Sequence, residues 1–124
     1  MIAIGKKSNG EEKEFSIRNN NTVYCSYNQL SELNLPNGVE RVYCNNNQLT
    51  ELHLPNGVKD VDCSSNQLTE LDLPNGVIKV YCYNNPIAEI TLPKSIRIAY
   101  IPLNCNVLNI DEFKNKDEVE IYFI

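Results

Sequence analysis

The sequence repeats itself at a constant interval. The triplet Val-Tyr-Cys, or a close copy of it, begins at residues 23, 42, 61 and 80, and Ala99 begins a looser fifth copy, so the period is 19. A period in this range is typical of a solenoid, in which each unit packs only against its neighbours. We therefore expect a repeat solenoid, a class of protein that usually works by presenting a surface.

Each repeat unit has the pattern of a flattened coil. In residues 39–57, apolar and polar residues alternate around Val42, which predicts a very short strand. Three asparagines at 45–47 then turn the chain, the leucine-rich residues 49–54 form a return side, and Pro-Asn-Gly at 55–57 turns it again. No segment is long enough for a helix of normal length, so we expect an extended or 3₁₀ return side.

One asparagine position is the same in every unit. An inward amide at a turn can satisfy both backbone N–H and C=O groups that would otherwise be unpaired. We therefore predict a structural ladder formed by Asn28, Asn47, Asn66, Asn85 and Asn104.

Four of the five cysteines also share one repeat position. If each unit adds one parallel strand, these thiols form an inward column and behave as small hydrophobic side chains; they are Cys25, Cys44, Cys63 and Cys82. A metal site is the alternative, but it usually needs short C-x-x-C pairs, which are absent. We expect no metal and no cofactor, and we expect Cys105, which stands off the column, to be the most exposed thiol.

The unit also carries a family resemblance. Val39-x-x-Val42-x-Cys44-x-x-Asn47-x-Leu49 resembles the leucine-rich repeat motif LxxLxLxxNxL, with cysteine in the third apolar position. The appended Leu-x-Leu-Pro resembles the short repeats of bacterial effectors and of related large-virus or amoeba-associated proteins. The resemblance covers about residues 20–106 and implies a short arc with a parallel sheet on its concave face. It implies no particular activity, because members of that family bind very different ligands.

The two ends of the chain depart from the repeat. Residues 1–19 contain two apolar stretches separated by Ser-Asn-Gly, which predicts a hairpin-like cap. Residues 107–124 predict a second cap, with a helical turn near 111–114 and a final strand at 119–123. Solenoids need such end units to cover their open apolar ends. We therefore expect one domain over residues 1–124, with about five repeats between 20 and 106.

The varying positions on the outer side of the strands are the candidate binding residues. Tyrosine provides rigid contact area with a polar tip and is frequent where proteins bind one another. The candidates are Tyr24, Tyr27, Arg41, Tyr43, Asp60, Asp62, Lys79, Tyr81, Tyr83 and Tyr100.

Two interpretations of these residues stay open. The tyrosines either bind a partner or only stack across neighbouring strands, and Arg41, Asp60 and Lys79 form either part of a binding surface or a cross-strand charge ladder. Asp62 interrupts the tyrosines beside Asp60. The hypothesis is that this acidic spot selects a basic group on a partner.

Charge and motifs exclude several functions. The formal net charge of −5 argues against nucleic acid and against anionic membrane as partners. No pattern of a secretory signal precedes the repeats, so a reduced, cytoplasmic chain is expected. No catalytic signature is present, and the single histidine, His53, lies at a variable position. A column of Glu32, Glu51, Glu70 and Glu89 favours solubility over a cation site.

The sequence thus predicts a non-catalytic module, a monomer, whose Tyr/Asn-rich concave face binds another protein. The resemblance to effector-type proteins extends this expectation to host–microbe or host–virus interaction, with the protein delivered into or expressed in a host cell. The alternative is a structural or regulatory repeat fragment, related to larger effectors, that has no tight partner of its own.

Overall fold

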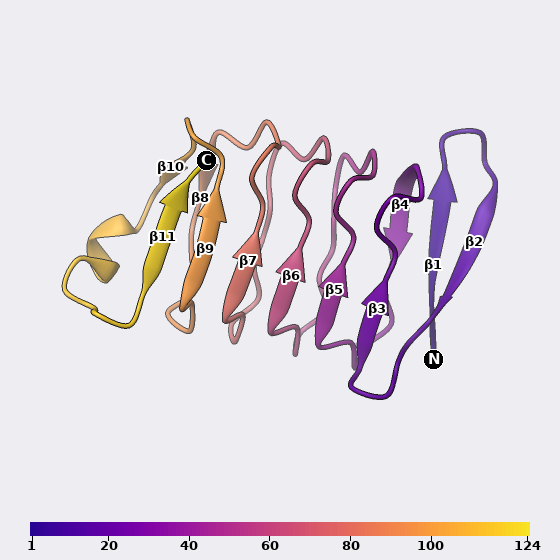
Figure 1. The fold of residues 1–124 in the computed structure, drawn as a ribbon, viewed down its shortest axis with the longest axis horizontal. Coiled ribbons are helices and arrows are strands. Elements are labelled where there is room, and N and C mark those ends of the chain that lie inside the picture. The colour runs from indigo at the N-terminus through magenta and orange to yellow at the C-terminus, as the bar shows by residue number, and fades with distance from the viewer.

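The repeats stack into a mostly-β solenoid of about five turns, seen in the computed structural model of residues 1–124 (Figure 1). One sheet runs along the molecule in the order β11-β9-β7-β6-β5-β3, and every strand in it is parallel to its neighbours. Its strands are β3 (Thr22–Tyr24), β5 (Arg41–Tyr43), β6 (Asp60–Asp62), β7 (Lys79–Tyr81), β9 (Ile98–Ile101) and β11 (Glu120–Phe123). The expected solenoid with a parallel sheet and almost no helix is confirmed.

The sheet is in register with the sequence period. Consecutive repeat strands pair with an offset of one period, so that equivalent side chains lie side by side. The central inward column is fully buried and consists of Val23, Val42, Val61, Val80 and Ala99. Together with the leucine columns of the return side it forms one hydrophobic core of 28 buried residues. No unit could bury these residues alone, which is why the coils stack.

The return side lies behind the sheet in Figure 1 and is mostly irregular. Its regular pieces are β4 (Leu30–Asn34), β8 (Glu89–Ile90) and β10 (Asn106–Val107). The turn that leads back to the sheet needs glycine, because Gly38, Gly57 and Gly76 have φ values of 99°, 101° and 102°. Ser95 replaces this glycine in the next unit, where its hydroxyl accepts a hydrogen bond from Gly76 N at 3.1 Å.

The amino-terminal cap is an antiparallel hairpin of β1 (Ile2–Lys7) and β2 (Glu12–Ser16). It joins the return side, because β1 also pairs antiparallel with β4. Gly5 permits this close approach: a Cβ atom there would lie 2.7 Å from Leu30 Cδ2. The hairpin therefore covers the first coil and contributes Ala3 and Phe15 to the core.

The carboxy-terminal cap combines a 3₁₀ turn, η1 (Ile110–Phe113), with the edge strand β11. Phe113 is buried at the end of the core. Strand β11 pairs with β9 in a register that departs from the repeat period, so that Tyr122 lies opposite Tyr100. The cap thus adds one more strand to the long sheet.

The turn after β9 removes Asn104 from the predicted ladder and buries Cys105. Cys105 N donates to Pro102 O at 3.0 Å, which closes a local turn that the other units lack. As a result Asn104 is exposed and its amide has no hydrogen-bond partner, so it is not a rung of the ladder. Cys105 is the most exposed of the five thiols, as expected, but at 7% exposure it is still buried and belongs to the core.

No helix of the protein has the length and hydrophobicity needed to span a membrane.

Candidate functional site

The outward side chains of the long sheet form the candidate site, which we call the sheet face. One row crosses all six strands and holds Tyr24, Tyr43, Asp62, Tyr81, Tyr100 and Tyr122, in the order of the strand pairing. Tyr24 is 57% exposed and Tyr122 is 42% exposed, at the two ends of the row, while the four members between them are partly buried. The row is therefore a nearly continuous aromatic strip open to solvent.

The tyrosines of the row form two stacks. Tyr24 and Tyr43 stack with ring centroids 5.3 Å apart, and Tyr100 stacks on Tyr81 at 4.7 Å and on Tyr122 at 4.9 Å. Tyr122 was not among the sequence candidates. The alternation of residues 119–123 did indicate a strand there. The sequence did not show that Tyr122 joins the row, because the register of β11 departs from the repeat period. The stacking expected of neighbouring strands is present, and it leaves every tyrosine of the row at least partly exposed.

Asp62 separates the two stacks. Its Oδ1 atom accepts hydrogen bonds from the backbone N–H of Ser64 at 3.1 Å and from the Ser64 hydroxyl at 2.6 Å. Its neighbours across the sheet are Tyr43 and Tyr81, so no basic side chain lies opposite it in the row. The other carboxylate oxygen has no hydrogen-bond partner.

The row beside it holds Arg41, Asp60 and Lys79 in register. These side chains do not form the charge ladder that their spacing suggested, because none makes an ion pair with another. Arg41 Nη1 donates to the carbonyl of Asn20 at 3.1 Å, and the Tyr43 hydroxyl donates to Asp60 Oδ2 at 2.9 Å. Asp60 Oδ1 is buried and has no hydrogen-bond partner.

The bond to Asp60 fixes the Tyr43 ring. Partial burial, this hydrogen bond and the negative charge of Asp60 raise the pKa of Tyr43 to about 12. The hydroxyl therefore stays protonated at neutral pH and remains a donor to the carboxylate.

Tyr27 lies just beyond β3, and it is the most exposed tyrosine of the candidate set at 75%. Its φ is 59°, in the left-handed region, as are those of Asn46, Ser65 and Asn84 at the equivalent position. Asparagine tolerates this conformation, whereas a bulky residue has a steric cost there. The Tyr27 ring stacks on no other ring and its hydroxyl has no partner. Tyr83, one position earlier in its own unit, is partly buried.

The asparagine ladder stabilises the turns that follow the strands of the sheet face. Asn47, Asn66 and Asn85 are buried, and the Nδ2 atom of each donates to the cysteine carbonyls of its own and the preceding unit at 3.0–3.1 Å. Their Oδ1 atoms accept from the backbone N–H groups of Leu30, Leu49 and Leu68 at 2.9–3.0 Å. Asn28 differs, because its amide donates to Ser26 O and accepts from the Lys13 ammonium.

Asn109 was missed in the sequence, although it belongs to the same scheme. Its side chain accepts from Leu92 N at 3.0 Å and donates to Leu92 O at 2.8 Å. The signal was its separation of 17 residues from Leu92, the same as between each buried rung and the leucine whose N–H it accepts.

The cysteine column lies directly beneath the rows. Cys25, Cys44, Cys63 and Cys82 are fully buried free thiols. Burial raises the pKa of Cys25 and Cys82 to about 12, and it raises the pKa of Cys44 and Cys63 as well. Burial also raises the pKa of Cys105. Such thiols are poor nucleophiles, because the thiolate is the reactive form.

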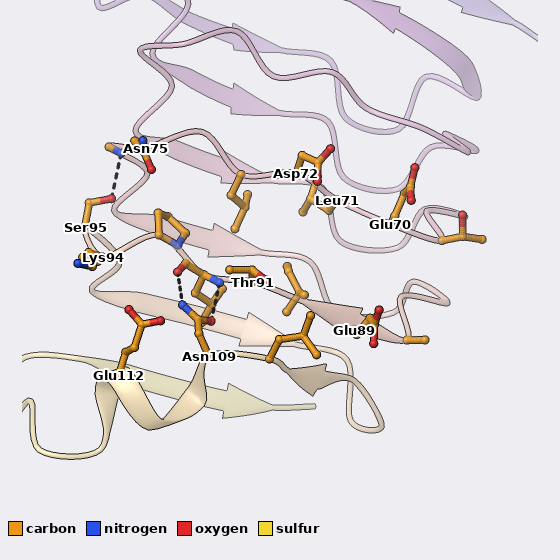
Figure 2. A pocket seen from close by; sticks show the side chains of 18 residues that line it. Glu70, Leu71, Asp72, Asn75, Glu89, Thr91, Lys94, Ser95, Asn109 and Glu112 are labelled. Carbon is orange, nitrogen blue, oxygen red and sulfur yellow. Dashed lines mark hydrogen bonds between the residues drawn. The ribbon is translucent and has the colours of Figure 1, made fainter.

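A groove lies on the return side, between the last repeats and the carboxy-terminal cap. It is an open groove of about 1070 Å³ (Figure 2). Figure 2 shows its charged residues spread over two neighbouring coils and the cap: Glu70 and Asp72, then Glu89 and Lys94, then Glu112. No group of three His, Cys, Asp or Glu side chains in the molecule is arranged to hold a metal ion.

The glutamate column and His53, which the sequence analysis also considered, lie on the return side. Glu32, Glu51, Glu70 and Glu89 are all exposed. His53 Nε2 lies 3.6 Å from a Glu51 carboxylate oxygen, with both side chains largely in solvent. This pair contacts no nucleophile, and it lies outside the sheet face.

No protein-family model matches the chain, and searches of curated proteins and of solved structures also give no match.

Proposed function

We propose that this protein is a non-catalytic binding module of the leucine-rich repeat type, and that its sheet face binds another protein. The tyrosine row supports this proposal, because rigid aromatic side chains with polar tips contribute strongly to protein recognition. The polar residues around the row, such as Ser26, Asn45 and Asn46, offer adaptable hydrogen bonding.

Tyr27 is the observation that carries the proposal. Stacking accounts for Tyr24, Tyr43, Tyr81 and Tyr100 without any partner, but it does not account for Tyr27. That ring is exposed, unstacked and held at a backbone position where two other units have asparagine. A side chain that costs stability without contributing packing is favoured where it makes contacts in a complex.

The cellular setting belongs to the same proposal. We place the protein in the reducing environment of a cytoplasm, and the effector-like resemblance supports that of a host cell. The cysteine column supports this, because thiols on adjacent parallel strands lie close enough for oxidation to join or distort them.

Replacing Tyr27 by asparagine tests the proposal. We expect Tyr27→Asn to raise the free energy of unfolding, by up to about 1 kcal/mol, because asparagine relieves the left-handed strain. In pull-downs from native or host lysate, we expect the same variant to retain much less of any protein that the wild type captures saturably.

His53→Asn is the matched control, since it places the same residue on the exposed return side. It should leave capture unchanged. Equal capture by wild type and Tyr27→Asn would contradict the proposed use of this face. A wild type that captures nothing saturably would favour the structural or regulatory alternative.

A further inference from the structure

The row of tyrosine rings is interrupted at Asp62, and we call this gap the slot. Tyr43 and Tyr81 lie on strands two steps apart, so their Cα atoms are about 10 Å apart, twice the strand spacing. A group midway between the two side chains would lie about 5 Å from each of them, within the range of a cation–π contact. The two tyrosine stacks form the walls of the slot, and the shorter Asp62 side chain forms its floor.

The carboxylate at the floor of the slot makes no ion pair within the protein. Ser64 holds one carboxylate oxygen of Asp62, which fixes the side chain and leaves the other oxygen without a partner. Arg41 is directed to the carbonyl of Asn20, and Lys79 makes no ion pair. Close by, Asp60 has a buried oxygen that accepts no hydrogen bond.

The walls of the slot are held in place before any ligand arrives. The Tyr43 hydroxyl is bound to Asp60 at 2.9 Å and its ring is backed by Tyr24. Tyr81 is backed by Tyr100, which is itself backed by Tyr122. A preformed site loses little conformational entropy on binding, which favours affinity.

We propose that this slot binds an arginine or lysine side chain of an extended partner segment, whose flanking side chains lie on the tyrosine stacks to either side. This inference rests on the proposed function and narrows it to a basic partner. A planar guanidinium between two rings makes cation–π contacts on both faces and an ion pair with Asp62 at the same time. The flanking stacks favour a peptide over an isolated cation, because only a chain can use both of them.

A random 12-residue peptide library, selected on the intact protein, tests the inference. We expect the selected peptides to share one arginine or lysine, and we expect selection on Asp62→Asn to show a weaker preference for that residue. Asparagine keeps the Oδ1 acceptor for Ser64 but removes the charge. Asp72→Asn, an equal change of charge on the exposed return side, should select the same basic peptides as the wild type.

The strongest selected peptide is then synthesised with arginine or with citrulline, its neutral isostere. We expect citrulline to weaken binding to the wild type about thirtyfold, the combined effect of two cation–π contacts and one exposed ion pair. On Asp62→Asn the difference should shrink to about fivefold, since only the ring contacts remain. Equal losses on both proteins would overturn the role of Asp62.

The failures of the two proposals are distinguishable. Peptides that need Tyr43 and Tyr81 but share no basic residue would overturn the cation slot and leave the binding face intact. A library that gives no binder dependent on these tyrosines would overturn the slot, while the lysate capture by wild type and Tyr27→Asn decides the proposed function separately.

Discussion

Single residues at one repeat position have very different structural roles here, and the asparagine ladder shows why. Asn66 serves four backbone groups that lie in the buried interior between coils: the carbonyls of Cys44, Cys63 and Ser64, and the N–H of Leu49. Asn104 occupies the same phase of the sequence and serves none, because the turn at Pro102 directs it to solvent. The same amide is therefore structural in one unit and dispensable in another.

This difference gives a prediction at the residue scale. Asn66→Ala leaves several buried backbone groups unpaired, so it should lower the free energy of unfolding by about 3–5 kcal/mol. Asn104→Ala should change it by less than about 0.5 kcal/mol, as expected for an exposed side chain without partners. Urea denaturation of both variants checks this. A similar loss of stability in the two variants would contradict this, because it would mean that Asn104 also belongs to the ladder.

At the scale of elements, the sheet is held by its side-chain rows as well as by its backbone. Strands of three or four residues form few ladder hydrogen bonds, so cross-strand pairs carry more of the stability than in longer strands. Strand β11 is one of the two edge strands of the sheet, so β9 is its only neighbour there. The stack of Tyr122 on Tyr100 joins the cap to the repeats.

The stacks therefore predict unequal effects of equal substitutions. Tyr100→Ala removes two stacking contacts and should destabilise the protein by about 1–3 kcal/mol, whereas Tyr24→Ala removes one exposed contact and should cost about 1 kcal/mol or less. Hydrogen exchange should show faster exchange in β11 for Tyr100→Ala and not for Tyr24→Ala. If β11 exchanges equally in both variants, its docking does not depend on the tyrosine stack.

For the whole molecule, the 19-residue period predicted those features that repeat unchanged from one coil to the next. The buried valine column, the cysteine column and the parallel register all follow from it, because equivalent residues meet in neighbouring coils. The period could not predict the places where a coil differs from its neighbours. Tyr122 joins the row although its separation from Tyr100 is not one period. The turn closed by Pro102 and Cys105 leaves the Asn104 amide exposed and buries the Cys105 thiol instead.

Contacts between different repeat positions were equally hidden in the sequence. Tyr43 binds Asp60 diagonally, from one row to the next, and this bond replaces the ion pairs that a row-by-row interpretation suggested. Which of two neighbouring polar groups pairs with a carboxylate depends on side-chain reach and direction, and a repeat pattern specifies neither. The sequence showed that Asp62 interrupts the tyrosines, but it did not show that Tyr43 and Tyr81 are held in fixed positions on either side of it.

The stacked thiols give the whole molecule a characteristic alkaline limit. The pKa of a free cysteine is near 9.0, and burial raises that of Cys25 and Cys82 to about 12 in the folded protein. Below about pH 9 the thiols are protonated in both states and do not affect the equilibrium. Above it the unfolded chain ionises first, so stability falls until the folded thiols ionise as well.

The slope of that fall reports the groups whose pKa folding raises, and the four column cysteines are the largest set. Each contributes up to about 1.4 kcal/mol per pH unit, so together they contribute up to about 5.6 kcal/mol per pH unit, enough to unfold a small domain within one or two units. Cys105 and Tyr43 add to the same fall, because their pKa values are raised too. Replacing one column cysteine, as in Cys63→Ala, should reduce the slope by up to about 1.4 kcal/mol per pH unit, even though the cavity lowers stability at every pH. Urea titrations between about pH 8.5 and 10.5 under reducing conditions measure both slopes. His53→Ala should leave the slope unchanged, and a Cys63→Ala slope equal to that of the wild type would show that the column ionises as readily folded as unfolded.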